Sequence, residues 1–114
     1  KNNMVKKIPD QGDIVWLSLD PTKGHEQKGR RPVIVLTKKE YNKATGCFLM
    51  CPLTTKRKGY ITEVLCEIDD KIAVILSDQI LCVDFTLRKA EYISTVSTEI
   101  LSEVKAKIHA LIFS

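Results

Sequence analysis

The sequence predicts a mainly β, α+β fold: a small antiparallel β-barrel with a short helix after the second strand and an amphipathic helix at the C-terminus. Two patterns support this prediction. Short apolar and β-branched runs alternate with turn-forming residues as far as Val96. From Ser97 onward, apolar residues recur at helical spacing instead. Many short strands followed by one helix are typical of a barrel closed by that helix.

Turn-forming residues divide the first part of the chain into strands. Gly12-Asp13 and Asp20-Pro21 enclose the first expected strand, Ile14 to Leu19. A polar loop from Thr22 to Arg30 follows, and its length favours a functional role. A second, buried strand is expected over Val33 to Leu36. The other expected elements are a helix over 37–44 that begins with a Thr37-to-Glu40 capping box, strands over 47–53, 61–68, 72–81 and 90–96 with turns at 69–71 and 84–89, and a helix from Ser97.

The composition is that of one ordinary globular domain. The chain has 114 residues, of which 44% are hydrophobic and 28% charged. We therefore expect a single domain over residues 1–114, with residues 1–10 as a flexible lead-in. The formal net charge is +4, and basic side chains gather in two runs, at 23–31 and 56–58. If the fold brings both runs together, they form a positive face for an anionic partner, although charge runs are also common in solvated loops.

The sequence gives no sign of a membrane segment, a metal or another cofactor. No apolar stretch approaches the ~20 residues that span a bilayer, and residues 1–9 lack the apolar core of a signal peptide, so we expect a cytoplasmic protein. His25 and His109 lie at unrelated positions, and the cysteines form no Cys-x-x-Cys pair, which disfavours zinc. We expect buried free thiols at Cys47, Cys51, Cys66 and Cys82.

One segment carries a specific signature. Gly12-Asp13-Ile14-Val15-Trp16-Leu17 and the stretch from Asp20 to Val33 resemble the MazF/PemK family of toxin endoribonucleases, with Gly24-His25-Glu26-Gln27 followed by Arg31-Pro32 as the most specific part. The resemblance extends over essentially the whole chain, through Pro52-Leu53-Thr54-Thr55, Lys58-Gly59-Tyr60, Asp78-Gln79 and Lys105-Ala106-Lys107-Ile108.

This resemblance implies an SH3-like barrel, a homodimer, a paired MazE-like antitoxin, and sequence-specific cleavage of single-stranded RNA (mRNA) without metal. Metal-free cleavage can use the 2′-hydroxyl of the substrate as the nucleophile, which leaves a 2′,3′-cyclic phosphate and a 5′-hydroxyl end. The protein then has to handle protons and to place a cation on the phosphate.

The resemblance also assigns candidate catalytic residues. Arg31 matches the family's catalytic arginine, whose planar guanidinium donates two parallel hydrogen bonds to phosphate oxygens. Thr54 matches the catalytic threonine, although a threonine at a strand end also commonly caps its own backbone. Glu26 is a candidate base for the 2′-hydroxyl, or else it orients Arg31 or orders the loop. His25 is a weaker alternative base.

The remaining candidates are RNA contacts. Gln27 and Gln79 carry amides that suit base edges, Lys56 can neutralise a phosphate, and Thr55 could replace Thr54 as the phosphate contact. Tyr60 could stack on a base, but a tyrosine beside a turn is more often packed against the barrel. Trp16 is expected in the core or in a dimer interface.

Two other classes of function fit the same architecture. One is a non-enzymatic toxin similar to the gyrase poisons, which share a barrel with a helix but act through a tryptophan-containing C-terminal tail. This chain ends Ala110-Leu111-Ile112-Phe113-Ser114, which weakens that alternative. The other is a plain RNA-binding module, which would bind RNA and leave it intact.

Overall fold

The computed structural model describes residues 8–18 and 29–113. Their secondary structure consists of β1 (Asp13–Ser18), β2 (Arg30–Val35), α1 (Lys39–Thr45), β3 (Cys47–Thr54), β4 (Glu63–Ile68), β5 (Lys71–Leu76), β6 (Leu81–Asp84), β7 (Glu91–Thr95) and α2 (Thr98–Phe113).

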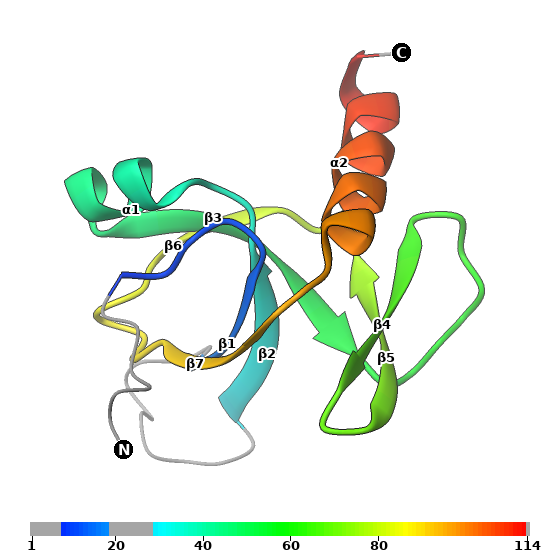
Figure 1. The fold of residues 1–114 in the computed structure, drawn as a ribbon, viewed down its shortest axis with the longest axis horizontal. Coiled ribbons are helices and arrows are strands. Elements are labelled where there is room, and N and C mark those ends of the chain that lie inside the picture. Colours follow the sequence, from blue (N-terminus) through cyan, green and yellow to red (C-terminus); the bar gives the residue numbers. More distant parts are fainter. Residues whose placement is uncertain (1–7, 19–28, 114) are drawn as a thin grey trace.

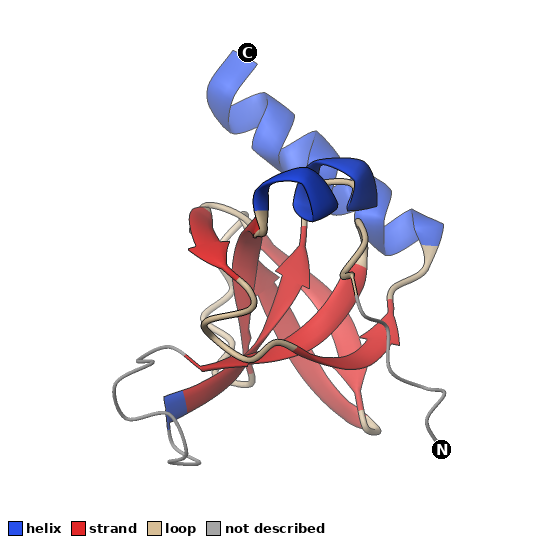
Figure 2. Ribbon diagram, turned by 90° about the vertical axis from the view of Figure 1, so that its left-hand side faces the viewer, coloured by secondary structure: helices blue, strands red, loops and turns tan. Residues whose placement is uncertain are grey.

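The strands form a curled, antiparallel half-barrel. Their order is β4-β5-β3-β2-β1-β7, and β6 pairs with β3 outside this path. Figure 1 shows that β1, β2, β3, β6 and β7 make the curl, while the β4–β5 hairpin extends to one side of it. In the view of Figure 2, both helices lie at the same end of the sheet. The expected small antiparallel β fold with a C-terminal helix is confirmed.

Strand β3 pairs along both of its edges. One edge pairs with β2 from Met50 to Pro52. The other edge pairs first with β6, over Cys47 to Met50, and then with β5, at Leu53 and Thr54. Pro52, which has no N–H to donate, lies where the second edge passes from β6 to β5, and a proline is tolerated at such an interruption of the ladder.

Because strand residues alternate between faces, the central strands bury side chains on both sides. Inside the curl lies one cluster, built from Val15, Leu17, Val33, Val35, Phe48, Met50, Val83 and Phe85. The Phe48 and Phe85 rings stack in it with centroids 5.5 Å apart. The opposite face packs against the β4–β5 hairpin and α2 through Ile14, Ile34, Cys51, Leu53, Val64, Cys66, Ala73, Ile75 and Val104. This two-sided burial explains why β2 reads as a continuous apolar run.

The start of α1 differs from the expected capping box. The residue before the helix is Lys38, and no side chain caps it there. The hydroxyl of Thr37 instead donates to Oδ1 of the buried Asn42 at 2.6 Å and accepts from the Leu49 backbone. The carboxylate of Asp10 accepts from the Lys39 N–H at 2.9 Å and so satisfies a first-turn amide. Tertiary contacts therefore replaced the local cap.

Part of the expected lead-in belongs to the fold. Pro9 is buried, and its carbonyl accepts a hydrogen bond from Asn42 at 2.8 Å. Together with the Asp10 contact, this bond attaches residues 9 and 10 to α1. Residues 1–7 of the expected lead-in lie outside the described residues.

Two expected strands have different limits. β2 begins at Arg30 rather than at Val33, so Arg31 lies inside a strand. The expected strand over 72–81 ends at Leu76, and Leu81–Asp84 forms the separate strand β6, which pairs with β3. The turn between β4 and β5 is confirmed: Asp69 and Asp70 both adopt positive φ, a conformation that aspartate tolerates. At α2, the predicted cap is also confirmed, because Ser97 Oγ accepts from the Ile100 N–H at 3.2 Å.

The four cysteines are free, but they are not equally buried. Cys51 and Cys66 are buried as expected, Cys47 is half-buried and Cys82 is exposed. Burial raises the pKa of Cys51 to about 12, and it also raises the pKa of Cys66. Burial, followed by the nearby Cys82 and Asp84, raises the pKa of Cys47.

This difference predicts the order of thiol alkylation. A raised pKa leaves less thiolate at pH 8, and the thiolate is the reacting species. We expect iodoacetamide to modify Cys82 first, Cys47 more slowly, and Cys51 and Cys66 only when the protein unfolds. Mass spectrometry of peptides from native and denatured protein measures the order. Native-state labelling of Cys51 or Cys66 as fast as that of Cys82 would contradict it.

Candidate functional site

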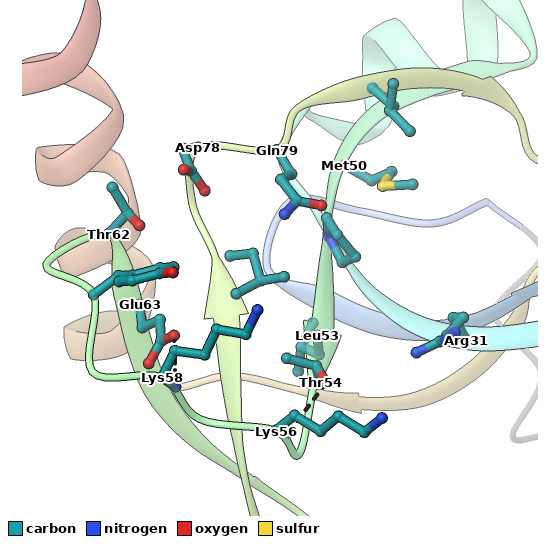
Figure 3. A pocket seen from close by; sticks show the side chains of 14 residues that line it. Arg31, Met50, Leu53, Thr54, Lys56, Lys58, Thr62, Glu63, Asp78 and Gln79 are labelled. Carbon is teal, nitrogen blue, oxygen red and sulfur yellow. Dashed lines mark hydrogen bonds between the residues drawn. The ribbon is translucent and has the colours of Figure 1, made fainter.

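The ladder between β2 and β3 brings the two candidate catalytic residues to the same place. Val33 pairs with Pro52, and Ile34 pairs with Cys51. The pairing ends at Val33 and Pro52, and two residues beyond this pair lie Arg31 on β2 and Thr54 on β3. Both side chains line the same two pockets, and Figure 3 shows Arg31 directed toward the end of β3 that carries Thr54.

The hydroxyl of Thr54 is held by the backbone that follows it. Thr54 Oγ1 accepts a hydrogen bond from the Lys56 N–H at 3.1 Å, drawn as a dashed line in Figure 3. A hydroxyl that accepts in this way retains its own proton for donation. The capping contact considered from the sequence is therefore present, and it leaves Thr54 able to donate to an anionic oxygen.

Two pockets, each of about 490 Å³, flank this pair. Both are lined by Arg31, Leu53, Thr54 and Lys56, so these residues form the boundary between them. The first, which we call the Gln79 pocket, also contains Lys58, Tyr60, Glu63, Asp78 and Gln79. The second, the Trp16 pocket, also contains Trp16, Arg30, Pro32, Thr55, Asp69 and Lys71.

Positive charge predominates along this boundary. Arg31 and Lys56 belong to both pockets, Lys58 adds a third cation to the Gln79 pocket, and Arg30 and Lys71 add two to the Trp16 pocket. The residues at the centre, Arg31 and Lys56, are exposed. An extended anionic chain could therefore cross the boundary with a phosphate beside Arg31 and a neighbouring unit in each pocket.

The loop between β3 and β4 is held by side-chain hydrogen bonds over residues 58–62. The Glu63 carboxylate accepts hydrogen bonds from the backbone N–H groups of Lys58 and Gly59, at 3.0 and 3.1 Å. Gly59 has φ +80°, a left-handed conformation that favours glycine. On the far side of the loop, Lys107 of α2 donates to the Ile61 carbonyl, and the Ser77 hydroxyl donates to the Thr62 carbonyl at 2.6 Å. These bonds fix the backbone that presents Lys56 and Lys58.

The structure places five of the seven predicted site residues. Arg31, Thr54 and Lys56 lie together on the boundary, Gln79 lies in the Gln79 pocket, and Thr55 lies in the Trp16 pocket. The candidate base Glu26 and the candidate RNA contact Gln27 lie outside the described residues, as does His25.

Three aromatic and charged residues differ from expectation or were missed. Trp16 is half-buried and lines a pocket rather than the core. Tyr60 is 62% exposed rather than packed against the barrel, so its alternative role as a base-stacking residue is the one that its position fits. Arg30 was counted only as part of a basic run, although its place beside the signature Arg31-Pro32 was a signal for a role at the site.

Within residues 8–18 and 29–113, no cluster of three or more His, Cys, Asp or Glu side chains is arranged to hold a metal ion. The same described residues contain no helix long and apolar enough to cross a membrane.

The fastening of the loop predicts its sensitivity to protease. Glu63→Ala removes both hydrogen bonds to Lys58 and Gly59, so the loop should open more often and trypsin should cut after residues 56–58 about five- to tenfold faster. Glu67→Ala is the matched control. Glu67 is exposed and lies on the same face of β4 as Glu63, four residues further along the strand. Timed digestion followed by mass spectrometry measures the rates. Equal rates for the two variants would show that Glu63 does not hold the loop.

Comparison with known proteins agrees with this geometry. Residues 10–112 match the family model described as PemK-like, MazF-like toxin of type II toxin-antitoxin system. The chain is 44% identical over 105 residues to the endoribonuclease toxin MazF of Escherichia coli strain K12, covering 92% of this chain and 95% of that protein. It is 33% identical over 116 residues to the endoribonuclease toxin ChpB of the same strain, covering 96% of this chain and 99% of that protein.

Solved structures give the same result. A crystal structure of MazF from Deinococcus radiodurans is similar with a TM-score of 0.82 and 37% identity, covering 96% of this chain and 100% of that one. A MazE–MazF crystal structure from the same organism is similar with a TM-score of 0.82 and 33% identity, covering 95% of this chain and 98% of that one. The chain therefore belongs to the PemK-like, MazF-like family of type II toxin–antitoxin toxins.

Proposed function

We propose that this toxin is a metal-independent endoribonuclease that cleaves single-stranded mRNA at specific sequences. The observation that carries the proposal is the position of Arg31 and Thr54, which lie at neighbouring ends of two paired strands and both line the two basic pockets. The family and the endoribonuclease relatives MazF and ChpB support the same activity.

The proposed reaction needs no nucleophilic side chain. The 2′-oxygen attacks the adjacent phosphorus as a base removes its proton, and the bond to the 5′-oxygen breaks as that oxygen gains a proton. The products are a 2′,3′-cyclic phosphate and a 5′-hydroxyl end. Negative charge rises on the non-bridging oxygens in the transition state, so preorganised donors next to them lower the barrier.

Arg31 and Thr54 supply these donors in the proposal. The guanidinium of Arg31 donates two parallel hydrogen bonds to the phosphate oxygens and keeps its charge at every physiological pH. The Thr54 hydroxyl, oriented by the Lys56 N–H, donates a third. Lys56 neutralises a neighbouring phosphate, and Thr55 lies on the Trp16 side of the boundary. Glu26 is kept as the candidate base, or as the residue that orients Arg31.

In the Gln79 pocket, we assign base recognition to Gln79. Its amide can both donate to and accept from the edge of an unstacked base. The exposed Tyr60 and the Asp78 carboxylate line the same pocket, and they add a stacking surface and an acceptor. Gln27 is proposed as a second amide contact.

The partners follow from the same relatives. MazF of Deinococcus radiodurans has been crystallised both alone and with MazE, and we propose that a MazE-like antitoxin inhibits this chain by occupying the RNA-binding surface. Failure of an antitoxin peptide to displace bound RNA would refute this shared surface.

We further propose a homodimer, which would join two basic surfaces. Light scattering at micromolar concentration tests this oligomeric state. The cytoplasm, which contains mRNA, is the proposed location.

Substitution Arg31→Lys tests the catalytic assignment. Lysine keeps the charge but loses the paired donor geometry, so single-turnover cleavage in excess EDTA should fall about a hundredfold. RNA affinity should fall much less, because the number of neutralised phosphates is unchanged. The melting temperature should hardly move, because the side chain is exposed. Arg57→Lys is the matched control, since Arg57 is an exposed arginine that lines neither pocket.

Four outcomes contradict the proposal in different ways. An Arg31→Lys variant that still cuts within a few-fold of the wild-type rate shows that Arg31 is not the phosphate clamp. Loss of wild-type cleavage in EDTA, restored by Mg²⁺, rejects the metal-free mechanism. A wild-type protein that binds RNA and leaves it intact supports the plain RNA-binding module, whereas toxicity without RNA binding supports a non-enzymatic toxin.

A further inference from the structure

The Trp16 pocket has no role in the chemistry above, although it shares its inner wall with the site. Arg31, Leu53, Thr54 and Lys56 separate it from the Gln79 pocket, so whatever occupies it lies directly beside the phosphate held by Arg31. Its volume of about 490 Å³ falls within the range of small-ligand sites, roughly 300–1,000 Å³.

Trp16 and Arg30 form a platform inside this pocket. The Arg30 guanidinium carbon lies 5.7 Å from the centroid of the Trp16 ring, a cation–π arrangement. Arg30 also donates to the Glu91 carboxylate at 2.7 Å, which limits the rotation of the guanidinium above the indole. The strand pairing supports this placement, because Trp16 lies opposite Glu91 on β7 and opposite Pro32 on β2.

The position of Trp16 on β1 explains why it is not buried. Ile14 and Trp16 lie on the same face of the strand because they are two residues apart. Ile14 packs in a cluster that includes Val104 of α2, and it is 1% exposed. Trp16 lies two residues after Ile14 on this face and is half-buried. Trp16 therefore lines a pocket that has a basic wall.

The charges of the pocket indicate the chemistry of its occupant. Four cations line it (Arg30, Arg31, Lys56 and Lys71) against one lining carboxylate, Asp69, and Arg30 is paired with Glu91, so positive charge still predominates. A ligand that suits both this charge and an aromatic platform has a planar apolar face joined to an anion. A nucleotide within a polynucleotide chain has this combination, and bases in single-stranded RNA commonly stack on aromatic rings and on guanidinium planes.

We propose that the Trp16 pocket binds the nucleotide on one side of the scissile phosphate by stacking its base on Trp16 and Arg30. This inference rests on the proposed function, because it extends the RNA path across the same boundary. None of the described residues of this pocket is an asparagine or a glutamine. Stacking on an aromatic ring holds any of the four bases, so the contact with Trp16 and Arg30 contributes affinity and position, whereas base selection is assigned to Gln79.

Fluorescence tests the contact directly, because Trp16 is the chain's single tryptophan. The probe is an RNA oligonucleotide that contains the mapped cleavage site and carries a 2′-deoxy sugar at the reacting nucleotide, so that it binds without being cut. Binding should quench the emission of Trp16. In a series of oligonucleotides with one abasic position each, the quenching should disappear at a single position adjacent to the scissile phosphate.

Substitutions of Trp16 test the energetics. Trp16→Leu should weaken binding of the intact oligonucleotide about tenfold, within the range measured for loss of one base–aromatic stack. It should cause no further loss with the abasic oligonucleotide, because the contact is already missing. Trp16→Phe should retain most of the affinity, and all variants should cut at the wild-type position. Tyr41→Leu is the matched control, since Tyr41 is an exposed aromatic residue of α1 that lines neither pocket.

The outcomes separate this inference from the proposed function. If wild-type protein binds and cleaves RNA but no abasic position restores emission, the stacking contact is wrong and the nuclease stands. The stacking contact is also wrong, and the nuclease stands, if Trp16→Leu weakens binding of the abasic oligonucleotide by the same factor as it weakens binding of the intact one. A change of molecular mass in Trp16→Leu would assign the residue to an interface instead. If the wild-type protein does not cleave RNA, the proposed function itself fails. Should Trp16→Leu not fold, the abasic series on wild-type protein decides alone.

Discussion

Backbone pairing along both edges of β3 is the constraint on which the rest of this structure depends. On one edge β3 pairs with β2, and on the other it pairs first with β6 and then with β5. It is therefore the strand that joins the curl to the β4–β5 hairpin. The hydrophobic clusters lie on its two faces, so Met50 contributes to one and Cys51 to the other. A shift of register by one residue would exchange these faces and remove both clusters at once.

The position of the site follows from this pairing. Thr54 ends β3 at the point where β5 takes over as partner, and Arg31 lies at the adjacent beginning of β2. Because β2 and the β4–β5 hairpin diverge here, a pocket is left on each side of the pair. Leu53, which is buried, forms the floor between them. Helix α2 contributes from a distance, since Lys107 binds the loop that carries Lys56.

Local sequence patterns predicted those features of the fold that local physics determines. Ser97 caps α2 through its own hydroxyl, and the Asp69-Asp70 turn depends on the tolerance of aspartate for positive φ, so both were predictable. The α1 cap was not, because Asp10, from far earlier in the chain, replaced Thr37. The break at Leu76 was missed for a similar reason: residues 72–81 read as one apolar run, but β5 and β6 pair with different parts of β3.

In the site, too, some features were predictable from the sequence and others were not. The resemblance indicated Arg31 and Thr54, and the structure places both on one boundary, but their roles stay predictions. The apolar strand around Trp16 predicts a place in the core or in a dimer interface. No pattern within the strand reveals that Trp16 lines a pocket beside Arg30. The Trp16 pocket also includes Asp69 and Lys71, which lie at the turn of the β4–β5 hairpin and which no local pattern connects with β2.

Some residues of this site lie on strands and others lie on loops, and these two kinds of segment differ in how freely their sequence can change during evolution. Arg31 and Thr54 lie on strands, each two residues beyond the pair Val33–Pro52, so their placement depends on the sheet rather than on the side chains of the neighbouring loops. Lys58, Tyr60 and Gln79 lie on connections between strands, where backbone length and sequence vary at little cost to the core. On the proposed roles, substitution in these connections would alter which RNA sequence is chosen while Arg31 and Thr54 are kept. A scaffold of this kind can diversify its loops around one fixed pair of side chains.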